Sequence, residues 1–110
     1  MAGGVHKYTV VESGNIAMGQ SGNSFVDTTG QYTPPFGKIV AITMLTPVEF
    51  SELTPESTSS WMGTTAAGPG TGGDTLSNAD TFPEGITIYG RWDSCTLQTG
   101  GDMILIYFAT

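Results

Sequence analysis

The chain has 110 residues, ten acidic against three basic side chains, and a formal charge of −7. A chain of this length forms one domain, and its 16 glycines and low charged fraction of 12% suit strands and turns rather than long helices. Three scattered cations are too few for a phosphate-binding patch, so we expect neither nucleic acid nor an anionic membrane surface as a partner.

Cysteine usage and the amino terminus suggest where the protein is made. Cys95 is the single cysteine, so no disulfide within the chain is expected. The first residues lack the basic and apolar regions of a signal peptide, and no apolar run approaches the roughly 20 residues that cross a bilayer. We therefore expect a soluble product made in a cytoplasm, with residues 1–6 as a flexible N-terminal arm.

Short strands are predicted in the first third of the chain. Residues 7–12 form a plausible first strand, residues 16–19 a short return strand, and residues 24–26 an edge strand. Glycine, serine and asparagine separate them, which is typical of turns.

The strongest strand signal lies at residues 38–46. This segment is β-branched and almost continuously apolar, with prolines on both sides, so it predicts the central buried strand. Residues 48–53 alternate apolar and polar side chains. Val48 and Leu53 share the face of Phe50 only if this strand contains a β-bulge.

A long Gly/Ser/Thr-rich loop is predicted at residues 54–80. A connection of this length without secondary structure is uncommon in a compact domain and is usually functional or mobile. Gly68–Gly73 superficially resembles a phosphate-binding loop but lacks the Lys-Ser/Thr that follows one. We interpret it as a loop tip.

The last quarter of the chain predicts a compact β-meander. A turn at residues 83–85 leads into a strand at residues 86–92, and a second turn at residues 99–102 precedes the apolar residues 103–108. The first of these strands places four side chains on one face: Ile86, Ile88, Gly90 and Trp92. About seven short strands in one domain predict an all-β fold, a small antiparallel β-sandwich or a jelly-roll-like barrel, over residues 1–110.

No catalytic, cofactor-binding or metal site is expected. His6 and Cys95 are the only residues that could form a thiol–imidazole pair, and no third, orienting group accompanies them. Cys95 is expected to be a small buried hydrophobe. One His and one Cys are too few for zinc, and the aspartates lack the spacing of a calcium loop. We therefore do not expect an enzyme.

Five residues are candidate contacts with another subunit or with a larger assembly: Trp61, Met62, Tyr89, Arg91 and Trp92. Trp61 and Met62 interrupt the polar loop, where they either cover an edge of the core or anchor the chain on a neighbour. Arg91 pairs either with an acidic group across a subunit boundary or with a local one. The sequence leaves both alternatives open.

Part of the chain resembles a known group of proteins. Residues 82–92 (Phe-Pro-Glu-Gly-Ile-Thr-Ile-Tyr-Gly-Arg-Trp), residues 95–100 and the aromatic pair at 107–108 resemble a recurrent carboxy-terminal pattern. The pattern occurs in small virion structural proteins of tailed phages of aquatic bacteria, such as cyanophages. Residues 8–12 and 35–40 are similar too, and the Ile-Tyr-Gly-Arg-Trp core is the most specific part.

This resemblance implies a capsid decoration (cement) protein on the outer surface of the virion. Its partners would be the major capsid protein and further copies of itself, as a homotrimer, after synthesis in the host cytoplasm. The resemblance carries no enzymatic residues. The alternative is a receptor- or glycan-binding fibre or head-fibre module, with Trp61, Tyr89 or Trp92 as an aromatic platform. A β domain with an unrecognised hydrolytic site is a weaker third interpretation.

Overall fold

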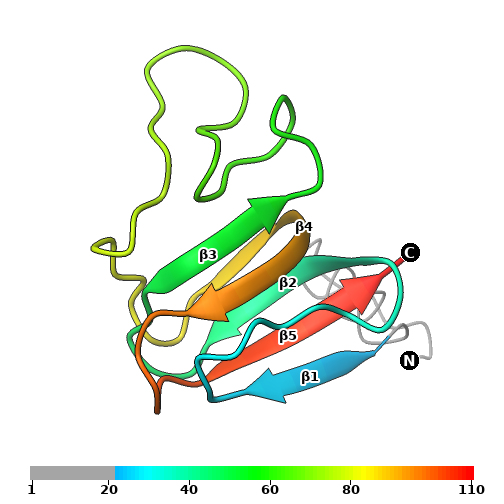
Figure 1. Cartoon of the computed structure of the whole chain (residues 1–110), viewed down its shortest axis with the longest axis vertical. Helices are drawn as coiled ribbons and strands as arrows, with labels where there is room; N and C mark the ends of the chain where they lie inside the picture. The colour runs from blue at the N-terminus through cyan, green and yellow to red at the C-terminus, as the bar shows by residue number, and fades with distance from the viewer. Residues whose placement is uncertain (1–21) are drawn as a thin grey trace, which may run out of the picture.

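The computed structural model describes residues 22–110, which form one antiparallel sheet of five strands (Figure 1). The sheet order is β1-β5-β2-β4-β3. The strands are β1 (Asn23–Val26), β2 (Lys38–Met44), β3 (Phe50–Pro55), β4 (Thr87–Leu97) and β5 (Ile104–Ala109). No helix occurs in this part of the chain, and therefore none long and apolar enough to cross a bilayer. The strands expected at residues 7–12 and 16–19, and the arm at 1–6, lie outside the described residues.

The central buried strand is confirmed as β2. It pairs with β5 along one edge and with β4 along the other. Ile39, Ile42 and Met44 are fully buried, as the nearly continuous apolar run predicted. The strand ends at Met44, two residues earlier than the run itself.

The strands expected at residues 24–26 and 48–53 are present, although the second one, β3, begins at Phe50 and ends at Pro55. β1 pairs with β5 alone among the described strands, so it lies at one edge of the sheet that residues 22–110 form. β3 forms the other edge, and its pairing with β4 shifts register between Phe50 and Glu52. This bulge allows Val48, Phe50 and Leu53 all to be fully buried.

The predicted β-meander is wrong, although both of its turns are present. Gly85 and Gly101 adopt positive φ of 89° and 93°, as the turns require. However, β4 and β5 do not pair with each other, because β2 lies between them. A buried central strand needs partners for its backbone groups on both edges, and β4 and β5 are the two apolar strands that supply them.

The all-β class is confirmed, but the sheet is not closed into a barrel, and residues 22–110 contain no second sheet. The first half of β4 pairs with β2 and its second half with β3. A register shift between these halves places Trp92 and Cys95 on the same face, and Figure 1 shows β4 curving strongly. One bent sheet therefore encloses a single core that includes Ile39, Ile42, Met44, Phe50, Leu53, Trp92, Cys95, Leu97, Ile104 and Ile106.

Candidate functional site

The long loop that follows β3, residues 56–81, is fixed at its root. The Trp92 indole N–H donates a hydrogen bond of 2.8 Å to the Met62 carbonyl oxygen. The backbone N–H of Thr64 donates to the Leu53 carbonyl at 2.9 Å. Gly63 lies so close to β3 that a Cβ there would be 2.2 Å from the Leu53 carbonyl oxygen. The loop contains no strand or helix, as expected, but backbone and core groups hold residues 61–64 at its root.

The far part of the same loop extends away from the sheet. The Leu76 N–H donates to the Gly63 carbonyl at 2.9 Å and closes the root. Beyond this closure lies the loop tip, which we define as residues 69–75, and every residue in it is exposed. Figure 1 shows the loop projecting from the β3 side of the sheet. Within the tip, Gly70 and Gly72 adopt positive φ and would have no neighbour within 4 Å of an added Cβ.

The candidate contact residues fall into different environments. Trp92 is only 1% exposed and belongs to the core. Met62 is partly buried and packs against that core, which agrees with the core-covering interpretation. Trp61 is half-buried and lies outside the core cluster. Tyr89, at 48% exposed, is the most accessible of the five.

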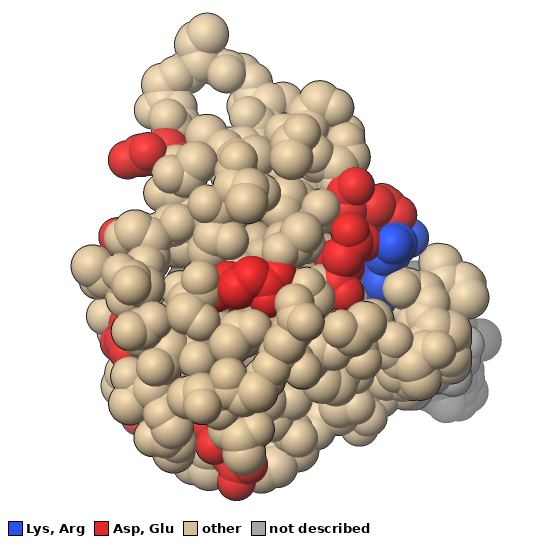
Figure 2. All heavy atoms as spheres, viewed as in Figure 1, with Lys and Arg blue, Asp and Glu red and all other residues tan. Residues whose placement is uncertain are grey.

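Both basic residues in the described part of the chain form local ion pairs. Arg91 Nε lies 2.9 Å from Glu56 Oε1, so Arg91 has an acidic partner within its own chain. Lys38 Nζ lies 2.6 Å from Asp93 Oδ1, a pair the sequence did not indicate. Figure 2 shows the blue atoms directly beside red ones, whereas other acidic groups are spread over this face. Both pairs are partly exposed, so each adds little to stability.

The structure also contains a polar cluster around Glu52 that was not predicted from the sequence. Its carboxylate accepts hydrogen bonds from Ser94 Oγ at 2.7 Å, Thr96 Oγ1 at 3.0 Å, Gln31 Nε2 at 3.4 Å, and the Thr54 hydroxyl. Partial burial raises the Glu52 pKa, but these four hydrogen bonds outweigh it and hold the pKa below its usual range. The cluster keeps a charged carboxylate on the sheet and joins β3, β4 and the β1–β2 connection.

Cys95 is a buried core residue, as expected. Burial, with a further contribution from the Glu52 charge, raises the pKa of its thiol to about 12. The thiol is therefore protonated at neutral pH and a poor nucleophile. His6, its only candidate partner, lies outside the described residues. Residues 22–110 also hold no group of three side chains suited to a metal ion.

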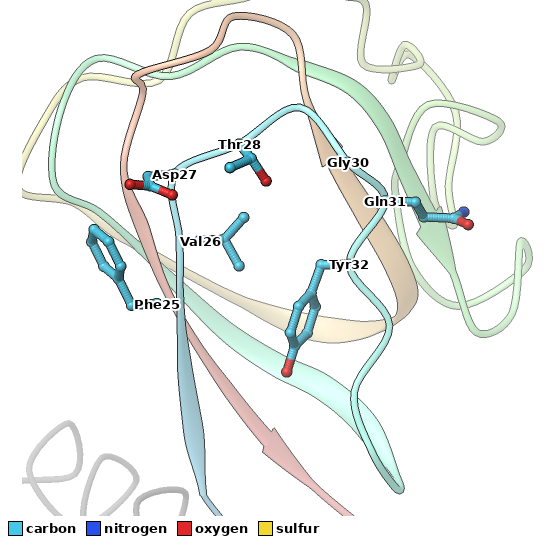
Figure 3. Close-up of a pocket in the computed structure, with 7 residues that line it drawn as sticks. All are labelled: Phe25, Val26, Asp27, Thr28, Gly30, Gln31 and Tyr32. Carbon is cyan, nitrogen blue, oxygen red and sulfur yellow. The ribbon is translucent and has the colours of Figure 1, made fainter.

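One small cavity, of about 190 Å³, lies between β1 and the connection that follows it. Its lining comprises Phe25, Val26, Asp27, Thr28, Gly30, Gln31 and Tyr32. In Figure 3, Val26, Thr28 and Tyr32 point toward the hollow, whereas Phe25 and Gln31 point away from it. The Tyr32 hydroxyl already donates to Ser24 Oγ at 2.9 Å. A single aromatic ring with an occupied hydroxyl does not make the platform that a glycan site would require.

Comparison of the chain with protein-family models, with curated proteins and with solved structures gives no match. The resemblance to phage virion proteins therefore stays a prediction.

Proposed function

We propose that this chain is a structural protein of a bacteriophage virion, a decoration protein that binds the outer surface of the major capsid shell and stabilises it. The sequence resemblance supports the proposal at residues 82–92, the segment that leads out of the long loop into β4. Phe82 and Trp92, at its two ends, pack in or against the core. The resemblance therefore concerns residues that build the scaffold rather than a reaction site.

The observation that carries the proposal is the contrast within the long loop. Its root is tied to β3 and β4 through Met62 and Thr64, whereas its tip is exposed and rich in glycine. Ordering a residue costs about 1–2 kcal/mol of backbone entropy, and the small side chains of the tip offer little internal packing in return. Such a tip can become ordered by contact with a partner surface. Because the root is fixed to β3 and β4, that contact then holds the whole domain on the partner.

In this proposal the candidate contacts divide by role. Trp61 and Tyr89, which keep exposed surface, contact the shell or another copy. Met62 and Trp92 hold the loop root, and Arg91 holds Glu56 beside it. Many weak contacts, repeated over the shell, combine to clamp neighbouring capsomers. The two-layered sandwich expected from the sequence belongs to the same proposal.

The proposal is tested by mixing the purified chain with phage heads that lack it and measuring co-sedimentation. Deletion of residues 69–73 removes most of the tip and is expected to abolish binding while thermal unfolding stays unchanged. The control is Gly100→Ala in another exposed turn, where an added Cβ meets only Thr29 Cγ2 at 3.9 Å. If the deletion variant binds heads as the control does, the tip does not grip the shell.

The alternative, a receptor- or glycan-binding module of a fibre, places the chain elsewhere in the particle. Finding only a few copies of the chain per particle, at one vertex or on the tail, would favour this alternative. So would particles without the chain that lose infectivity but keep their head stability. Trp92, one of its three candidate platform residues, is buried in the core.

A further inference from the structure

The strand pairings of the described sheet all join the same two parts of the chain. We name residues 22–68, before the loop tip, the first half, and residues 76–110, after it, the second half. The first half contributes β1, β2 and β3, and the second contributes β4 and β5. In the order β1-β5-β2-β4-β3 the halves alternate at every position, which Figure 1 shows as blue or green strands beside orange or red ones. Among the strands of residues 22–110, every pairing is therefore between the halves.

The core is divided between the halves in the same way. The first half supplies Ile39, Ile42, Met44, Val48, Phe50 and Leu53, and the second supplies Trp92, Cys95, Leu97, Ile104 and Ile106. None of these side chains is more than 1% exposed. Separating the halves would expose all of them to water, and burial of apolar surface is the main force that holds a fold together. Noncovalent contacts across the whole sheet thus hold one half on the other.

The covalent link through the loop tip adds little to these contacts. Every residue from 69 to 75 is exposed, and none belongs to the core cluster. No backbone–backbone hydrogen bond between residues of the range 22–110 involves the tip. The Thr75 N–H donates to the side chain of its own neighbour, Asp74, at 2.8 Å. Exposed loop tips made of small and polar residues are the preferred places for proteolytic cutting.

The exposed turn between β4 and β5 differs from the tip in this respect. The Gln98 N–H donates to the Glu49 carbonyl at 3.0 Å, and the Gly101 N–H donates to the Asp27 carbonyl at 3.3 Å. A protease would have to break such bonds before it could bind this turn, because the backbone must first leave its neighbours. The tip requires no comparable local unfolding.

The segments on either side of the tip are each attached to the opposite half. Before the tip, the Met62 carbonyl accepts the indole hydrogen bond of Trp92, which belongs to the second half. After the tip, Phe82 exchanges two backbone hydrogen bonds with Val48 of the first half, at 2.8 and 2.9 Å. The Phe82 ring also packs edge-on against Phe50, with ring centroids 5.8 Å apart. A break within the tip leaves both attachments in place.

We propose that the loop tip is a proteolytic processing site, where an endoprotease that accepts small side chains cuts the chain into two parts that remain one folded domain. Hydrolysis adds one water molecule across a peptide bond between residues 69 and 75, so one new end is a carboxylate and the other an amino group. The described strand pairings and core contacts are all kept. This inference does not depend on the capsid-decoration proposal, because it concerns the free chain.

Limited digestion of the full-length chain with subtilisin, followed by mass spectrometry, tests the position of the cut. We expect the first cut within residues 22–110 to lie between residues 69 and 75. Deletion of residues 69–73 should slow cutting of this loop at least tenfold. The matched control, Gly100→Ala in the exposed turn, should be cut at the tip as fast as the unchanged chain. A first cut elsewhere in residues 22–110, or equal rates for the deletion and the control, would overturn the proposal.

Cys95 reports whether the cut parts stay together. It lies in the second half, and its backbone N–H and C=O pair with those of Tyr32 in the first half, at 3.1 and 2.8 Å. In the cut chain its buried thiol should stay unlabelled by a maleimide for as long as complete labelling takes in urea. The two parts should also elute together from a sizing column.

The unfolding temperature supplies a further readout of a two-chain domain. Unfolding of the cut chain separates two molecules, so its unfolding temperature should rise with protein concentration more steeply than that of the intact chain. Rapid labelling of Cys95 without denaturant, separate elution of the parts, or an equal concentration dependence before and after the cut would each show that the cut chain is not one folded domain.

Discussion

The Trp92 indole donates its hydrogen bond to the carbonyl oxygen of Met62, a residue 30 positions earlier in the chain. The bond joins the core at the bend of β4 to the root of the long loop. Trp92 itself is almost fully buried, so its N–H requires a partner inside the protein. The loop position is thereby coupled to core packing.

Trp92→Phe should therefore destabilise the fold and loosen the loop root. Losing the indole leaves the Met62 carbonyl unpaired and a gap in the core, a cost of about 2 kcal/mol. Urea unfolding measures the loss, and exchange of the Thr64 amide, bonded to Leu53, reports on the root. The half-buried Trp61→Phe serves as the control, with an expected change of about 0.5 kcal/mol or less. Equal losses for the two variants would show that the bond to Met62 does not matter.

The Glu52 cluster predicts a dependence of stability on pH. Because the folded pKa of Glu52 lies below its unfolded value, its contribution is present above about pH 4.3 and is lost as the pH falls through the folded pKa. Glu52→Gln should cost about 1 kcal/mol at pH 7, since solvent screens this half-buried group, and less at pH 3, which lies below the unfolded pKa. Denaturant unfolding at both pH values measures this difference. The exposed Glu84→Gln should show neither effect, and a pH-independent loss for Glu52→Gln would contradict the assignment.

Asp102 should affect stability in the opposite direction from Glu52 as the pH changes. One of its carboxylate oxygens is buried and has no hydrogen-bond partner among residues 22–110. Burial first, and then the charge of Glu49, raise the pKa of Asp102. A raised folded pKa contributes stability below the unfolded value of about 3.9 and loses it as the pH rises through the folded pKa. Asp102→Asn should thus raise the unfolding temperature at pH 7 but not at pH 3, with the exposed Asp27→Asn as the control. A lower unfolding temperature at pH 7 would refute this account of Asp102.

Cys95 should be inert in the folded protein. With a thiol pKa of about 12, almost no thiolate exists at pH 7, and the side chain is buried. A maleimide reagent should label the native chain only as fast as it unfolds, and should add one label per chain in urea, because Cys95 is the single cysteine. Rapid labelling without denaturant would show that the thiol is accessible.

Local signals in the sequence predicted much of the fold, because they depend on neighbouring residues. The apolar run from Lys38 predicted β2, the spacing of Val48, Phe50 and Leu53 predicted a bulge, and Gly85 predicted a turn; all three are present. The order of the strands was not predictable in this way. The position of β2 between β4 and β5 depends on which apolar strands pair with the backbone N–H and C=O groups along its two edges. These strands lie far apart in the chain, so local sequence patterns do not reveal the pairing.

The candidate site was less predictable for the same reason. The Trp92–Met62 bond, the Lys38–Asp93 pair and the Glu52–Ser94 bond join residues 30, 55 and 42 positions apart. Glu52 alone reads as an ordinary exposed residue of an alternating strand. Only the register of β3 against β4, which brings Ser94 and Thr96 beside it, reveals the cluster. The opposite face of the same strands carried a clear apolar signal, because burial leaves a pattern in sequence and hydrogen-bond partners do not.

The most direct test of the proposed function is a cryo-electron microscopy reconstruction of phage particles that carry this chain. We predict density for this five-stranded sheet at many symmetry-related positions on the outer surface of the head, with the tip at residues 69–75 against the major capsid protein. Heads without this density, or density confined to a tail or a single vertex, would contradict the account.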